Sequence, residues 1–220
     1  DLKIRMAQKV IWEHTEDMEL VAAFMPAFTT KLYSHIQYAL SKDGRGYYWE
    51  FQKPRVPVLA DYYGSREEAE ALYEKFMGIY QRLPKKGVVY SPCIFPWHQV
   101  ELSPSIVVAQ MAFLAYVLQD EEKITYIAGL LGNVGSGRAR LVNLLLYQPS
   151  NQEQRNLVIG LMGNAEAQAS DTAVKIVKNL TLNQGEYRLL EDMLRFKRSS
   201  LRGILISMLM GQPKETMKDS

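Results

Sequence analysis

The 220-residue sequence predicts a mostly α-helical protein, an α–α superhelix of HEAT- or armadillo-like helix pairs. Two observations carry this prediction. The segment IAGLLGN at residues 127–133 recurs as VIGLMGN at residues 158–164, an offset of 31, and a weaker copy, LLEDMLR, occupies residues 189–195. A period of this length is typical of stacked helix pairs. In addition, Gln148-Pro149 and Gln212-Pro213 close corresponding predicted helices 64 residues apart, about two repeats.

Residues 1–98 are expected to form an N-terminal helical subdomain with an irregular, aromatic-rich insert. Apolar residues at helical spacing predict a helix over residues 4–25, inside which Thr15-Glu16-Asp17 offers a second helix start. Another helix is expected over residues 29–40, before turn residues at 41–46. Residues 47–64 are aromatic and β-branched and contain two prolines, so any strand there is expected to be short or at an edge.

The clearest helix start in this part is at Ser65. Ser65 and Glu68 have the spacing of a capping box, in which each side chain accepts a backbone N–H of the other residue. The helix is expected to run past Phe76 and to end before Pro84. Residues 85–102 then form a long irregular connection, which indicates either function or unrecognised structure. We place the main domain boundary within it.

Residues 99–213 are predicted to form the helical repeat stack, followed by a polar tail at residues 214–220. Ser103 and Pro104 have the N-cap and first-position residues of a helix over residues 104–119, which is apolar on nearly every side and therefore central. Asp120 is expected to cap the next helix, over residues 121–131. Further helices are predicted at about residues 137–148, 151–163, 171–181, 185–196 and 200–211, and Ser150 with Glu153 is a second capping box.

Glycines 129, 132, 135 and 137 raise the alternative of a phosphate-binding loop. Neither G-x-x-x-x-G-K-[ST] nor a G-x-G-x-x-G between strand and helix is present. Gly129 and Gly132 instead recur as Gly160 and Gly163 at the repeat offset. We therefore expect left-handed helix caps at Gly132 and Gly163, and close approach of neighbouring helices at Gly129 and Gly160.

Composition limits the classes of function. The net charge of +2 is too close to balance to indicate a nucleic acid or an anionic membrane as partner. A single cysteine excludes an internal disulfide framework, and the most apolar run, residues 106–118, is too short to span a bilayer. We expect a cytoplasmic protein with no membrane partner. Because the chain begins at Asp1 in what resembles the middle of a helix, we expect it to be an excerpt of a larger protein.

Catalytic and metal-binding sites are not predicted. Cys93 and His98 lie five residues apart in a proline-rich segment, but a structural zinc site needs four ligands, usually in close pairs, and no nucleophile signature accompanies them. The carboxylates of residues 67–74 occupy the expected solvated face of a helix. The sequence therefore predicts a protein that is not an enzyme and that has no cofactor and no bound metal.

The aromatic insert is the first candidate for binding. Residues 47–97 contain 12 of the chain's 23 aromatic residues. Such rings either fill an irregular core or form a recognition surface. For the second alternative the candidate partner-binding residues are Tyr47, Tyr48, Trp49, Trp97 and His98.

A basic cluster near the C-terminus supports a rival hypothesis. Arg195, Lys197, Arg198 and Arg202 could grip nucleic acid, although acidic residues such as Glu191 and Asp192 interleave with them. A third hypothesis is a non-catalytic segment of a large enzyme.

The run YRLLEDMLRFKRSSLRGILISMLMGQP, residues 187–213, resembles a helix pair in very large bacterial proteins loosely labelled MolR-like. This resemblance implies HEAT-like stacking and a longer parent chain, and it implies no catalytic residue. We expect a helical-repeat scaffold that binds a protein or peptide. Self-association is also expected through the apolar face of the last helix, formed by Leu201, Ile204, Leu205, Met208 and Leu209.

Overall fold

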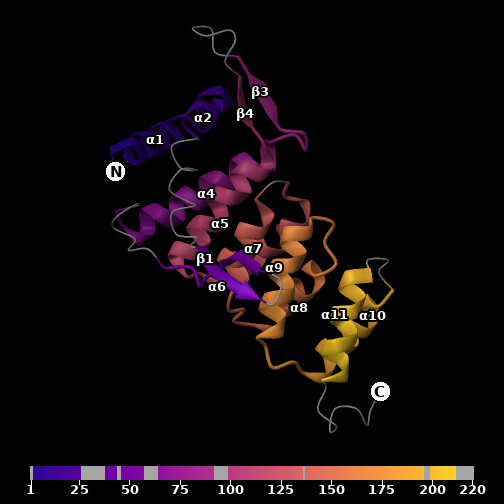
Figure 1. The fold of residues 1–220 in the computed structure, drawn as a ribbon. Helices are drawn as coiled ribbons and strands as arrows, with labels where there is room; N and C mark the ends of the chain where they lie inside the picture. The colour runs from indigo at the N-terminus through magenta and orange to yellow at the C-terminus, as the bar shows by residue number, and fades with distance from the viewer. Residues whose placement is uncertain are drawn as a thin grey trace. The chain divides into compact units, whose positions relative to one another are not determined.

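The computed structural model describes residues 2–25, 38–43, 46–56, 64–91, 99–135, 137–195 and 199–211. These residues form ten α-helices, one short 3₁₀ helix and two pairs of strands, so the chain is mostly helical as predicted (Figure 1). No helix in these ranges is long and apolar enough to cross a membrane.

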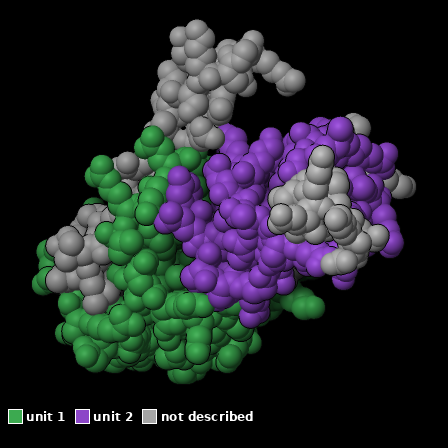
Figure 2. Space-filling model, turned by 90° about the horizontal axis from the view of Figure 1, so that it is seen from below, with its two compact units in different colours: residues 1–145 green, residues 146–220 purple. Residues whose placement is uncertain are grey.

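The chain divides into two compact units, Asp1–Leu145 and Leu146–Ser220, which Figure 2 colours separately. Their border falls in helix α7 (Arg138–Leu146), whereas we expected a boundary near residue 98. The physical reason lies in unit 1, where helix α4 (Arg66–Arg82) packs along helix α5 (Pro104–Leu118). Apolar contacts thereby join the two sides of the expected boundary.

Two short helices begin unit 1. Helix α1 (Leu2–Glu13) ends before Asp17, and helix α2 (Met18–Phe24) starts there, as the second helix start predicted. The Asp17 carboxylate accepts the backbone N–H groups of Glu19 and Leu20, each at 3.1 Å. This N-cap satisfies donors that the first turn of a helix leaves unpaired.

The prediction of a helix over residues 29–40 is wrong for the C-terminal end of that range. Tyr38 to Leu40 belong to strand β1 (Tyr38–Asp43), which pairs antiparallel with strand β2 (Gly46–Phe51). Tyr38 lies opposite Phe51, so the strand is stabilised by partners that a local pattern cannot reveal. Residues 29–37 lie outside the described ranges.

The segment after β2 is anchored to the helices of unit 1. The Tyr116 hydroxyl of α5 donates to the carbonyl of Pro54 at 2.9 Å, and the Asn143 amide of α7 donates to the carbonyl of Gln52 at 3.0 Å. Pro54 and Asn143 are both buried. The hairpin that carries the first candidate aromatic residues is therefore held next to α5 and α7.

Helix α4 begins with the predicted capping box at Ser65 and Glu68. Part of the connection after α4, for which we expected either function or unrecognised structure, consists of two short strands. Strands β3 (Val88–Tyr90) and β4 (Val100–Leu102) pair antiparallel, with Val88 opposite Leu102. Residues 92–98 are outside the described ranges.

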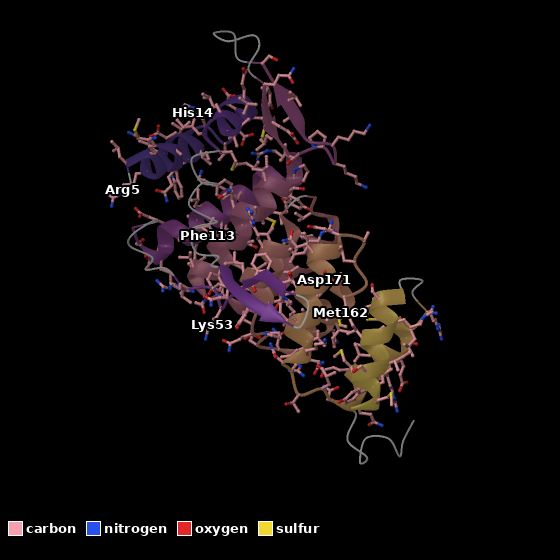
Figure 3. All side chains as sticks on the ribbon, in the orientation of Figure 1. Arg5, His14, Lys53, Phe113, Met162 and Asp171 are labelled. Atoms are coloured by element: carbon pink, nitrogen blue, oxygen red, sulfur yellow. The ribbon has the colours of Figure 1, made fainter. Side chains whose placement is uncertain are left out.

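Helix α5 is the centre of unit 1, as its apolar sequence predicts. Eleven of its fifteen residues are buried, among them Phe113 (Figure 3). Ser103 caps it and Pro104 begins it, both as expected. Helix α6 (Glu121–Leu130) packs against α5 and continues into the 3₁₀ helix η3 (Leu131–Asn133).

Unit 2 contains helices α8 (Gln152–Leu161), α9 (Ala167–Lys178), α10 (Gln184–Met193) and α11 (Ser199–Met210). Helix α8 packs against both α9 and α10, and α10 packs against α11. The capping box predicted at Ser150 and Glu153 is displaced by one residue. Asn151 is the N-cap and accepts the N–H of Gln154 at 2.8 Å, while the Gln154 side chain accepts the N–H of Ser150 at 2.9 Å.

The sequence period has a structural counterpart at helix starts. Asp120, Asn151 and Asn183 are N-caps 31 and 32 residues apart, and each begins a helix of ten residues. In each case the side-chain oxygen accepts the N–H three residues later. The repeated helices thus share their length and their capping geometry.

The role expected for the repeated glycines is wrong. Among the described residues, φ is positive at Gly64, Gly87, Gly137 and Gln119, so Gly132 and Gly163 are not left-handed caps. These helix ends tighten into 3₁₀-type turns instead. A Cβ atom added at Gly129 or Gly160 would meet nothing within 4 Å, so neither glycine permits a close helix approach.

Candidate binding groove

Helices α1 and α4 enclose a groove of about 600 Å³ within unit 1, which we call the Trp12 groove. Both helices contribute long polar side chains. The described lining residues are Arg5, Gln8, Lys9 and Trp12 from α1, Glu68 and Leu72 from α4, and Gly64, two residues before α4.

The sequence of α1 places these side chains on one face. Arg5, Lys9 and Trp12 follow the i, i+4, i+7 spacing of a helical stripe, whereas Ala7 and Ile11 are fully buried on the opposite side. Arg5 extends from the N-terminal part of the helix (Figure 3). The Trp12 side chain is 45 % exposed, which leaves a large aromatic surface open to a partner.

Two cations of α4 hold the C-terminal end of α1. Lys75 Nζ donates to the Trp12 carbonyl at 2.9 Å and lies 4.5 Å from the centre of the Trp12 ring. Arg82 donates to the Thr15 carbonyl at 2.8 Å. Helix α1 has no basic residue in its last turn, so these side chains from α4 stabilise the negative end of its dipole. Trp12 is thereby positioned before any ligand arrives.

The N-terminus of α4 forms the other end of the groove. Gly64 has φ +68°, and a Cβ atom there would lie 2.2 Å from Glu68 Oε2. The glycine leaves room for the Glu68 carboxylate, which accepts the Ser65 N–H at 3.1 Å, while Ser65 Oγ accepts the Glu68 N–H at 3.2 Å. Among the lining residues that the structure describes, the one acidic side chain is therefore engaged at the start of its own helix.

A carboxylate beside this helix start is also stabilised in its charged form. The pKa of Glu67 is lowered by a hydrogen bond from its own backbone amide, then by one from the Ser65 side chain, with a smaller contribution from Arg66.

The described part of the groove has the groups of a recognition surface: a half-exposed indole and two exposed cations. Among the described residues, no three His, Cys, Asp or Glu side chains gather closely enough to hold a metal ion.

The predicted aromatic site lies largely outside the described side chains. Tyr47, Tyr48 and Trp49 belong to strand β2, where they pair with Lys42, Ser41 and Leu40, but only their backbone is described. Trp97 and His98, with Cys93, lie outside the described ranges. Two other aromatic residues of the insert, Tyr73 and Phe76 on α4, are buried in the core.

The predicted basic cluster is described in part. Arg195 is exposed and lies 3.8 Å from the Asp192 carboxylate, and Arg202 is exposed on α11. Lys197 and Arg198 lie outside the described ranges. An exposed arginine next to a carboxylate carries little net positive potential, so the described part forms no coherent basic patch.

The face expected to mediate self-association is partly packed. Of its residues, Leu201 and Leu205 of α11 are buried, and Ile204, Met208 and Leu209 are half-buried. The more exposed apolar side chains of α11, Ile206 and Met210, do not belong to this face. Self-association through the face stays a prediction.

Sequence reasoning missed the Trp12 groove. The available signal was the spacing of Arg5, Lys9 and Trp12, a tryptophan within a basic helical stripe. Trp12 is an isolated ring outside the dense cluster of aromatic residues at positions 47–97, from which the candidate binding residues were taken.

A family of unknown function, DUF5724, has a model that matches residues 1–220. The chain belongs to this family. Among curated proteins and among solved structures, no significant match is found. The match to DUF5724 covers both compact units, and its description assigns neither an activity nor a ligand.

Proposed function

We propose that this chain is a non-catalytic binding module of helical repeats, part of a larger protein, which recognises a peptide segment of another protein. The observation that carries the proposal is a set of bonds between α8 and α10, two helices at equivalent positions of the repeat.

These bonds join residues one repeat apart. Arg155 donates to both carboxylate oxygens of Glu186, at 2.6 and 2.7 Å, and Asn183 donates to Gln152 at 2.9 Å. Each of these pairs is separated by 31 residues. Gln152 also donates to Glu186 at 2.8 Å. The first turns of α8 and α10 are therefore joined directly by side-chain hydrogen bonds.

Such a connection supports a HEAT-like stack. In a repeat protein each unit contacts its neighbours, and the row of units leaves an extended surface that suits a long or irregular partner. The resemblance of residues 187–213 to MolR-like proteins supports the same architecture and a longer parent chain. We infer that the repeat stack is a scaffold and that its partner is a protein or peptide.

The rival, a nucleic-acid-binding repeat protein, has less support. It requires a coherent basic surface, and its described members, Arg195 and Arg202, do not supply one.

A selection experiment tests the proposal. The purified chain is used to select from a random peptide library displayed on phage, and enriched sequences are synthesised and titrated against it. We expect a shared sequence motif and a saturable interaction of micromolar strength. The absence of any enriched motif, together with strongly salt-dependent binding of mixed-sequence DNA or RNA, would favour the rival.

A further inference from the structure

We propose that the Trp12 groove binds an acidic peptide segment that inserts one bulky apolar side chain as its anchor. This inference rests on the proposed peptide-binding function. It places a binding site on helices α1 and α4, outside the predicted repeat stack of residues 99–213, and it names the chemical class of the peptide.

The groove offers one apolar surface to a ligand, the half-exposed Trp12 ring, because Leu72, which also lines the groove, is only 1 % exposed. Lys75 contacts this ring and also bonds the Trp12 backbone, so the indole loses little freedom when a ligand arrives. A leucine or aromatic side chain seated here would remove more of the ring from water, which is the usual source of binding energy at interface hot spots.

The charges around the seat favour an acidic partner. Arg5 and Lys9 lie one helical turn apart along the α1 rim, and both are exposed. Within the described part of the chain, Lys9 pairs with Glu13 at 3.9 Å, and because both side chains are more than half exposed the contact has little strength. Glu68, the carboxylate among the described lining residues, accepts the Ser65 N–H at the start of α4. An arriving carboxylate therefore meets two available cations.

The size of the groove also fits a peptide segment. A volume of about 600 Å³ is within the range of pockets that hold a few side chains or a small ligand, roughly 300–1,000 Å³. A nucleic acid would need a longer coherent basic surface than the two cations of this rim, Arg5 and Lys9, provide. A short acidic peptide with one apolar anchor needs no more than these two cations and the Trp12 ring.

Fluorescence anisotropy with three labelled peptides tests the chemistry. The first alternates aspartate and glutamate around a central Leu-Phe pair, the second replaces that pair by Ser-Ser, and the third replaces the acids by lysine. We expect the first peptide to bind the full chain with micromolar affinity. The other two should bind at least about tenfold more weakly, because each lacks one of the two recognition elements.

Variants of the chain test whether the peptide binds in the Trp12 groove. Arg5→Glu combined with Lys9→Glu reverses the rim charge at exposed positions and should weaken the first peptide about tenfold. Lys178→Glu, an exposed reversal on α9 in unit 2, is the control and should leave the affinity unchanged. Trp12→Ala should abolish binding and Trp12→Phe should retain part of it, with circular dichroism checking that each variant is folded.

The results separate the inference from the function on which it rests. Equal affinity for the first two peptides, or an unaltered affinity after the rim reversal, would overturn the groove assignment. If phage-selected peptides bind but ignore the rim and Trp12 variants, the peptide-binding function stands and the groove assignment falls. If neither selected nor designed peptides bind, both fail. Tighter binding of a single-stranded oligonucleotide that displaces the first peptide would assign the groove to nucleic acid instead.

Discussion

Arg155 of α8 donates two hydrogen bonds to the buried carboxylate of Glu186 on α10, from Nε to Oε1 at 2.6 Å and from Nη2 to Oε2 at 2.7 Å. The same carboxylate accepts the backbone N–H of Asn183, its own N-cap residue, at 2.8 Å. One side chain therefore completes a capping box and joins two repeated helices. Because of this dual role, we expect substitution of either residue to destabilise unit 2.

Arg155→Met should destabilise unit 2, because it leaves the fully buried Glu186 carboxylate without its counter-charge. We expect a loss of about 3 kcal/mol in the free energy of unfolding, the low end of the range for broken buried pairs, since Arg155 itself is one-fifth exposed. Hydrogen exchange of α8 and α10, read by mass spectrometry, measures the loss locally. The exposed substitution Lys178→Met is the control and should change stability by less than about 0.5 kcal/mol. Equal exchange in the two variants would contradict the role of the pair.

The same carboxylate predicts a pH dependence. Burial raises the pKa of Glu186, but hydrogen bonds from Arg155, the Asn183 backbone and Gln152 outweigh it, so the pKa lies below its ordinary value of 4.5. A lowered folded-state pKa contributes stability above the unfolded-state value, and that contribution is lost as the pH falls through the folded-state pKa. Unit 2 should therefore keep this contribution at neutral pH and lose it below about pH 4.5. Urea denaturation of wild type and Glu186→Gln across this range checks it, and parallel pH profiles would refute it.

Two glycines at α4 should respond oppositely to alanine. At Gly64 the positive φ and the 2.2 Å approach to Glu68 Oε2 mean that a methyl group displaces the capping carboxylate. We expect Gly64→Ala to destabilise the chain by about 1–2 kcal/mol. At Gly78, in the helix interior, the added Cβ meets only Arg82 Nη1 at 3.8 Å, so Gly78→Ala should stabilise it by about 0.5–1 kcal/mol. Thermal unfolding of both variants measures the signs, and a loss of similar size at both positions would count against the capping argument.

The repeated glycines give a test of the architecture. Gly129 and Gly160 are helical and their added Cβ atoms would meet nothing within 4 Å, so each alanine variant should raise stability by about 0.5–1 kcal/mol. Gly87→Ala is the contrasting variant, because φ is +71° and the Cβ would lie 2.7 Å from the Leu102 carbonyl. Chemical denaturation of all three compares them. Destabilisation by alanine at Gly129 and Gly160 would instead support the close approach of neighbouring helices that the repeat pattern predicted.

Helix starts were the most predictable features of this fold. Asp17, Ser65, Ser103 and Asp120 each act within three or four residues, so their chemistry is visible in a short stretch of sequence. Where two capping residues stood side by side, at Ser150 and Asn151, the same reasoning chose the wrong one by a single position.

Features that depend on distant partners were not predictable in this way. Strand β1 forms because Tyr38 pairs with a backbone thirteen residues away, and its own residues also suit a helix. The Trp12 groove depends on where α4 lies, and the bond from Lys75 to the Trp12 carbonyl spans 63 residues. Helical spacing could indicate which face of α1 carries Arg5, Lys9 and Trp12, but not that this face borders a groove rather than a packed interface.

Peptide recognition is the central claim, and calorimetric titration of the chain with its phage-selected peptide tests it most directly. We predict a single saturable site of micromolar affinity that weakens only modestly between about 50 and 200 mM salt, because an apolar anchor is insensitive to screening. A mixed-sequence oligonucleotide titrated in parallel should bind weakly. A flat peptide titration, together with oligonucleotide binding that falls by orders of magnitude over the same salt range, would contradict the claim.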